Sequence, residues 1–185
     1  VIGTILGAVA GYYGGVVDYV ISSITDIAWS FPTTLLAIAF IAALGTGLEN
    51  VIIAIVLASW SGYCRVVRGQ FLSLKEREFV EAARVLGMSD ARIIFRHILP
   101  NSVTPVVVMA TLELPKAIVI EASLSFLGLG AQPPLPSWGV ILDSGKGLLE
   151  QAPWISLFPG LMIMLVVLGF NLFGDALRDV LDPKS

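Results

Sequence analysis

Long apolar segments alternate with short polar ones along the 185 residues of this chain. Residues 27–48 and 154–174 are uncharged over 22 and 21 positions, and a helix needs about 20 such residues to cross the hydrocarbon core of a bilayer. Residues 98–128 form another apolar segment. A shorter one, residues 50–64, should continue as a helix to about Phe71, because arginine side chains can extend to the membrane interface. The pattern predicts an all-α, multi-pass transmembrane helical bundle.

The N-terminal segment is apolar and rich in glycine. Residues 1–13 are fewer than the about 20 that a crossing needs. The chain also opens without Met or a charged leader, so we interpret it as truncated at the N-terminus, within a partial first span. Gly14 and Gly15 should end this segment and place Asp18 in a short polar connection. About five spans are therefore expected, the first of them partial.

Prolines divide two of the expected spans. The span over about residues 20–44 should kink at Pro32, where the freed backbone groups must find local partners. The span over residues 98–128 should be interrupted by Pro100, Pro105 and Pro115. Residues 132–139 contain three more prolines and cannot hold a regular helix, so we expect a loop on the outer side there.

Composition and charge support a membrane protein. The chain is 56% hydrophobic and 14% charged, with a mean hydropathy of +0.88, outside the usual balance of soluble domains. Seven of its eleven Lys and Arg residues lie within residues 65–96. Short basic loops stay on the cytoplasmic side, so this segment and the C-terminal end with Arg178 and Lys184 should be cytoplasmic. A single Cys64 and a single His97 exclude an internal disulfide and offer little for metal or acid–base chemistry.

Residues 72–99, here called the polar loop, contain the one long polar stretch of the sequence. A good helix-forming run starts at Lys75 and lasts to Leu86, and four of its residues recur at spacings of three or four: Phe79, Ala82, Ala83 and Leu86. We expect a short amphipathic helix. Its small alanines would let a groove of another protein approach the backbone, and Glu81 would pair with a basic group there. A helix lying on the lipid surface is the alternative.

A second helix should follow in the polar loop. Gly87 is placed to end the first helix in the left-handed conformation. Ser89 or Asp90 can cap the second, which should run past His97 until Pro100 begins the next span. The sequence therefore predicts a helix, a sharp turn and a helix on the cytoplasmic side.

Glu113 and Lys116 are charged residues within an expected span. On insertion scales such groups cost about 2.5–3.5 kcal/mol at the centre of a transmembrane helix, so they usually face protein or water. Their spacing of three allows them to pair on one helical face. One interpretation places them on a translocation pathway, where Glu113 would meet the positive end of a peptide or a cation. The other makes them a structural bridge, with Glu121, or a pair hydrated near the outer interface.

Several segments resemble a known family. The tripeptide Glu-Ala-Ala at residues 81–83, followed by Gly87 and by Leu-Pro at residues 99–100, resembles the EAA loop of the membrane subunits of bacterial ABC importers. That loop docks into a cleft on the ATPase subunit. The family pattern usually has isoleucine two residues before Leu-Pro, where this chain has His97.

The resemblance extends over essentially the whole chain and is closest to the dipeptide, oligopeptide and nickel permease group, specifically its C-type subunit. It rests on four segments in order: FVEAA (79–83), RHILPN (96–101), EASLSFLGLG (121–130) and PSWG (136–139). We therefore identify residues 1–185 as a single type I permease domain with an EAA-type coupling loop over residues 72–99.

The resemblance implies an inner-membrane importer built from this chain, a second B-type permease, two ATPases and an extracytoplasmic solute-binding protein. This chain would form half of the pathway for di- or oligopeptides, with nickel or glutathione as alternative cargo. Docking to the ATPase would involve six residues: Phe79, Glu81, Ala82, Ala83, Leu86 and Gly87.

The chain itself is expected not to be an enzyme. It lacks a G-x-x-x-x-G-K-[ST] loop for nucleotide phosphates, so ATP and Mg²⁺ would be bound by the ATPase subunits, and no catalytic residue, metal, cofactor or nucleic acid is assigned to it. A less favoured hypothesis is an ion-coupled secondary transporter that uses Glu113 and Lys116. A membrane-embedded hydrolase is weaker still, because no catalytic Ser/His/Asp set or HExxH motif is present.

Overall fold

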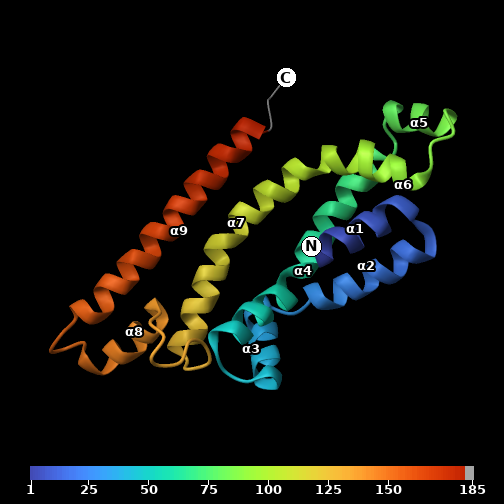
Figure 1. The fold of residues 1–185 in the computed structure, drawn as a ribbon. Coiled ribbons are helices and arrows are strands. Elements are labelled where there is room, and N and C mark those ends of the chain that lie inside the picture. The colour runs from blue at the N-terminus through green and yellow to red at the C-terminus, as the bar shows by residue number, and fades with distance from the viewer. Residues whose placement is uncertain (182–185) are drawn as a thin grey trace. The chain divides into compact units, whose positions relative to one another are not determined.

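The computed structural model describes residues 1–181, and every regular element within that range is a helix, as predicted. Lys184 lies outside the described residues. In chain order the elements are α1 (Ile2–Tyr13), α2 (Gly15–Trp29), α3 (Thr33–Leu44), α4 (Leu48–Leu74), α5 (Glu78–Val85), α6 (Asp90–Ile93), the π-helix η1 (Ile94–Ile98), α7 (Leu99–Phe126), α8 (Trp138–Gly145), the 3₁₀-helix η2 (Lys146–Leu148) and α9 (Trp154–Leu181) (Figure 1).

Three helical segments among the described residues are long and apolar enough to cross a membrane: Leu48–Leu74, Asp90–Phe126 and Trp154–Leu181. The pair α2 and α3 would make a fourth, but these two helices meet at 90°. α1 is apolar and has 12 residues, fewer than a crossing needs. All five predicted apolar segments are thus helical, and three of them are unbroken helices of spanning length.

The predicted kink at Pro32 is a complete break between α2 and α3. α2 ends at Trp29, and Pro32 takes an extended conformation (φ −57°, ψ 129°) before α3 begins at Thr33. Proline lacks an N–H group, and its ring would clash with the carbonyl four residues earlier in a continuous helix. It also drives the preceding residue, Phe31, away from the helical region.

The predicted end of the first segment at Gly14 and Gly15 is confirmed, but the polar connection expected after it is not present. α1 ends at Tyr13, Gly14 and Gly15 have positive φ angles of 68° and 56°, and α2 begins directly at Gly15. Asp18 therefore lies in the first turn of α2 and not in a polar connection. The predicted outer loop ends at Ser137, whose side chain accepts a 3.2 Å hydrogen bond from the Val140 N–H and so starts α8. Trp138 and Gly139 consequently belong to a helix.

α7 contains Pro100, Pro105 and Pro115 without interruption, contrary to the prediction. The π-helix η1 directly before it explains how Pro100 is accommodated. The Leu99 N–H donates to the Ile94 carbonyl, five residues earlier, which is a wider turn than that of an α-helix. The Asn101 side chain donates a 2.6 Å hydrogen bond to the His97 carbonyl, so a side chain supplies a bond near the point where Pro100 has no N–H to give.

The described residues divide into two compact units, each with its own core. The first contains Val1–Phe31 and Ser59–Met109; the second contains Pro32–Ala58 and the chain from Ala110 onward. α4 and α7 are continuous helices that contribute to both units. The single permease domain over residues 1–185 stays a prediction.

In the first unit, α1 packs closely on α4 through glycines spaced four residues apart. A Cβ atom on Gly3 would lie 2.2 Å from the Trp60 carbonyl oxygen, and one on Gly7 would lie 2.4 Å from that of Cys64. Gly11 repeats the contact one turn later, against Phe71 and Arg68. Glycine at such positions lets two helix backbones approach within a membrane. Sequence reasoning noted the glycines but missed this regular spacing.

The second unit has a core between α3, α4 and α7 made of Ala37, Ile41, Val51, Ala54, Ala58 and Leu124. Ser125, near the end of α7, organises the chain that follows. Its hydroxyl donates a 2.6 Å hydrogen bond to Glu121 and accepts a 3.0 Å hydrogen bond from the Ala131 N–H. A Cβ atom on Gly130 or on Gly139 would lie within 2.7 Å of Ser125 atoms. The motifs at 121–130 and 136–139 therefore have a packing role in this unit.

Candidate functional site

The polar loop forms two short helices joined by a tight turn, as predicted (Figure 1). The first helix, α5, begins at Glu78 and not at Lys75, and Arg77 precedes it in an extended conformation. Val80 and Ala83 on α5 are buried in the core of the first unit, whose remaining members are Tyr12, Val67, Phe71, Ile93 and Ile98. α5 is therefore held against α1, α4, α6 and η1 by its inner face.

The inner face of α5 differs from the predicted one. Ala83 was predicted to face a docking partner, but it is buried in this chain's own core beside Val80, while Phe79, Ala82 and Leu86 are exposed. The small size of Ala83 thus serves packing within this chain. The predicted stripe and the buried pair Val80 and Ala83 both fit a spacing of three or four. Which face of α5 turns inward is determined by the core that covers Val80.

The outer face of α5 is apolar although it lies in the polar loop. It consists of Phe79, Ala82, Val85 and Leu86, all exposed. Val85 and Leu86 are 83% and 75% exposed, so the chain leaves large side chains uncovered beside charged ones. An exposed apolar patch rimmed by polar residues marks an interaction site.

Gly87 ends α5 in the left-handed conformation (φ 72°), as predicted. The Gly87 N–H donates to the Arg84 carbonyl, and the Met88 N–H donates to the Ala83 carbonyl at 3.1 Å. This pair of bonds is the Schellman motif, in which the residue after the glycine usually packs back on the helix. Met88 does pack against the buried cluster that contains Ala83. The turn therefore fixes how the second helix leaves α5.

The second helix runs from Asp90 through η1 into α7. Ser89 occupies the N-cap position with an extended backbone, but its side chain makes no capping hydrogen bond. Asp90 instead accepts a 2.6 Å hydrogen bond from the hydroxyl of Tyr12 on α1. His97 lies within η1, and its Nε2 atom is enclosed without a hydrogen-bond partner among the described residues.

A pocket lies between the polar loop and the end of α1. It is lined by Tyr12, Lys75, Glu76, Glu81 and Arg84. Glu81 is exposed at its rim, and the guanidinium carbon of Arg84 lies 5.9 Å from the centre of the Tyr12 ring. Charges of both signs therefore meet where a partner could approach Glu81.

The predicted pairing of Glu113 with Lys116 is confirmed. Lys116 Nζ lies 2.6 Å from Glu113 Oε1, and the two side chains are 65% and 25% exposed. Glu121, which was expected to join them in one interpretation, instead accepts the hydrogen bond from Ser125.

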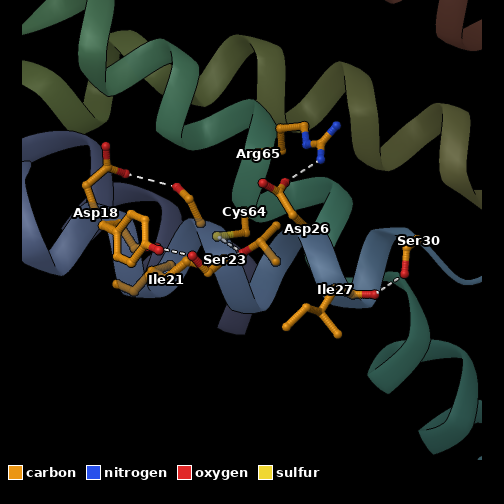
Figure 2. Close-up of polar contacts among 11 residues, drawn as sticks. Asp18, Ile21, Ser23, Asp26, Ile27, Ser30, Cys64 and Arg65 are labelled. Atoms are coloured by element: carbon orange, nitrogen blue, oxygen red, sulfur yellow. Dashed lines mark hydrogen bonds and ion pairs between the residues drawn. The ribbon is translucent and has the colours of Figure 1, made fainter.

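Two further ion pairs join α2 to α4 and were missed by sequence reasoning. Arg65 pairs with Asp26 (Figure 2). Arg65 Nη2 lies 2.6 Å from Asp26 Oδ1, and the guanidinium carbon lies 4.6 Å from the centre of the Trp29 ring. Arg68 pairs with Asp18. Both arginines had been expected only to reach the membrane interface. The sequence does show two aspartates on α2 and two arginines on α4. Which aspartate pairs with which arginine can be known only from the way in which the two helices pack.

Comparisons with known proteins place this chain in a family. Residues 3–185 match the family described as "Binding-protein-dependent transport system inner membrane component". The chain is 53% identical over 184 residues to the dipeptide transport system permease protein DppC of Alkalihalophilus pseudofirmus, covering 100% of this chain and 60% of that protein.

Two glutathione transport system permease proteins GsiD are similarly related. The one from Pectobacterium atrosepticum is 49% identical over 183 residues, covering 99% of this chain and 61% of the relative. The one from Shigella dysenteriae is 51% identical over 183 residues, covering 99% and 60%. The chain thus spans about three fifths of the length of these relatives. With its helical spans and its helix–turn–helix loop, the chain belongs to the family of inner membrane components of binding-protein-dependent transport systems.

Proposed function

We propose that this chain is a permease subunit of an ATP-driven importer and forms half of the translocation pathway for short peptides. Its family supports the importer, and the names of its relatives, which specify dipeptide and glutathione transport, support a peptide cargo. Glutathione is itself a short peptide and is the alternative cargo; nickel is a second one.

The single observation that carries the proposal is the apolar outer face of α5. Phe79, Val85 and Leu86 are uncovered in a loop that otherwise carries charges. We propose that this face docks into a cleft on an ATPase subunit, with Glu81 at the rim of the contact and Gly87 shaping its end. ATP and Mg²⁺ would be bound by that subunit.

The proposed assembly contains this chain, a second permease of the B type, two ATPases and an extracytoplasmic solute-binding protein. The basic residues of the polar loop favour its placement on the cytoplasmic side, together with the C-terminal end of the chain. The apolar helices α7 and α9 would contact lipid and the second permease.

Transport would follow from motion at the docking face. α5 is packed on α1 and α4 by its buried inner face, so a displacement of α5 moves these helices with it. Binding free energy at the ATPase contact then biases the population of outward- and inward-open states, because a ligand shifts an equilibrium by its difference in affinity for the two states. Glu113 and Lys116 remain candidates for residues that line the pathway.

The docking proposal is tested by Leu86→Ser and Phe79→Ser in the full transporter. Both changes remove exposed apolar surface without disturbing the buried cluster. We expect the tagged permease to retain less ATPase subunit in co-purification, and ATP-driven uptake of a labelled dipeptide into proteoliposomes to fall. Leu149→Ser, at an exposed apolar residue outside the polar loop, is the matched control. Unchanged co-purification and uptake, or uptake by vesicles that lack the ATPase, would contradict the proposal.

A further inference from the structure

We infer that Tyr12 is a positioning residue that links α1 to both helices of the polar loop, so that motion at the docking face reaches α1 directly. This inference rests on the proposed function. It assigns a role to a residue far from the loop's own motif in the sequence.

The contacts of Tyr12 span the turn at Gly87. On one side its hydroxyl donates a 2.6 Å hydrogen bond to Asp90, the first residue of α6. On the other side the Arg84 guanidinium, on α5, lies 5.9 Å from the ring centre. Tyr12 itself is 7% exposed and belongs to the same buried cluster as Val80 and Ala83. One side chain of α1 therefore contacts the helix before the turn and the helix after it.

The chemistry of the Tyr12–Asp90 bond suits a mechanical link. A hydrogen bond to a carboxylate is shorter and stronger than one between neutral groups. Ser89 makes no side-chain capping bond, so the start of α6 is held by Tyr12 through Asp90 and not by its own N-cap. Without the hydroxyl, α6 could shift relative to α1 by movement at the Gly87 turn.

The α1 end of the Tyr12–Asp90 link is held firmly in place. Three glycines, Gly3, Gly7 and Gly11, hold α1 directly against the backbone of α4. A force applied at Asp90 therefore reaches α4 through Tyr12 and α1, in parallel with the covalent path through the loop. Loss of the hydroxyl should leave docking possible but weaken the coupling between docking and transport.

The test measures dipeptide transported per ATP hydrolysed by the reconstituted full transporter with its solute-binding protein. Tyr12→Phe removes only the hydroxyl and keeps the ring in the core. We expect the ratio to fall clearly below that of the wild-type transporter, while the ATPase subunits still co-purify. Tyr13→Phe is the matched control, because Tyr13 is the next residue and its hydroxyl makes no hydrogen bond within residues 1–181.

Variants of Asp90 distinguish a link from general loss of stability. Asp90→Asn keeps an acceptor oxygen and should retain most of the ratio, whereas Asp90→Ala should lower it as Tyr12→Phe does. The double variant Tyr12→Phe with Asp90→Ala should have a ratio no lower than that of either single variant, because the effects of groups that act through one contact are not additive. A normal ratio for Tyr12→Phe, or additive losses, would overturn the inference. Failure of the wild-type transporter to show any ATP-driven uptake would instead overturn the proposed function.

Discussion

Arg68 on α4 binds both carboxylate oxygens of Asp18 on α2, with Nη2 donating to Oδ2 at 2.7 Å and Nε donating to Oδ1. Ser22 adds a third hydrogen bond to the same carboxylate. The Asp18 side chain is only 17% exposed. The two helices are thus joined by a charged contact that is largely withdrawn from solvent, in addition to their apolar packing.

Replacing Asp18 with Ala should destabilise the first unit. The Arg68 guanidinium would lose both hydrogen bonds to a carboxylate that is largely buried, and a hydrogen bond to a charged group contributes about 1.5–3 kcal/mol. The matched control is Asp26→Ala. The side chains of Asp26 and Arg65 are 66% and 47% exposed. This pair should therefore contribute less than about 1 kcal/mol to the free energy of unfolding. Thermal unfolding in detergent measures both variants, and equal shifts would show that burial does not govern these pairs.

The glycines of α1 give a second prediction. Gly7→Ala places a methyl group 2.4 Å from the Cys64 carbonyl oxygen, so α1 must move away from α4. Overpacking of this kind costs about 1–3 kcal/mol. Gly69→Ala, on α4 with no atom within 4 Å of its added Cβ, should instead stabilise the helix by roughly 0.5–1 kcal/mol. The sign of the two changes in unfolding temperature should therefore be opposite.

Gly87→Val should disrupt the turn of the polar loop. The φ angle of 72° is costly for any residue with a Cβ atom, about 1–2 kcal/mol, and worst for a β-branched one. We expect reduced ATPase co-purification with normal membrane insertion. Gly147→Val is the control, because Gly147 lacks a positive φ and has open space around it. Full ATPase retention by the Gly87 variant would show that the turn does not shape the docking face.

Substitutions at Glu113 and Lys116 can show whether this ion pair lines the pathway or is a structural bridge. Lys116→Met breaks the ion pair and should lower dipeptide uptake if the pair lines the pathway. The double variant Glu113→Lys with Lys116→Glu keeps the ion pair but reverses its direction. Recovered uptake in the exchanged protein would favour the structural bridge, and continued loss would favour the pathway.

Local sequence signals predicted the helices, the break at Pro32 and the left-handed turn at Gly87. Each follows from a property of one residue: the missing N–H of proline and the missing Cβ of glycine. The same reasoning failed for Pro100, because it assumed an α-helix where the chain forms the wider turns of η1. Pro105 and Pro115 lie inside the regular α-helix α7, so a proline in a long apolar helix does not by itself predict a break.

The candidate site was only partly predictable. Glu81 and Leu86, the exposed residues proposed to dock, could be named from the sequence, but the inward direction of Val80 depends on which residues of α1 and α4 cover it. The bond from Tyr12 to Asp90 joins residues 78 positions apart. No spacing rule connects such residues, since their meeting depends on how α1 packs.

The π-helix η1, at the end of the polar loop, absorbs one residue. A π-helix contains one residue more than the α-helical path it replaces, and each residue of an α-helix turns the chain by about 100°. Deleting one residue within Ile94–Ile98 should therefore restore an α-helical path and leave the residues at the start of α7 facing nearly as they do now. The same deletion in a regular stretch of helix would rotate every residue after it by about 100°, so η1 is a place where this helix can lose a residue without changing the face that follows.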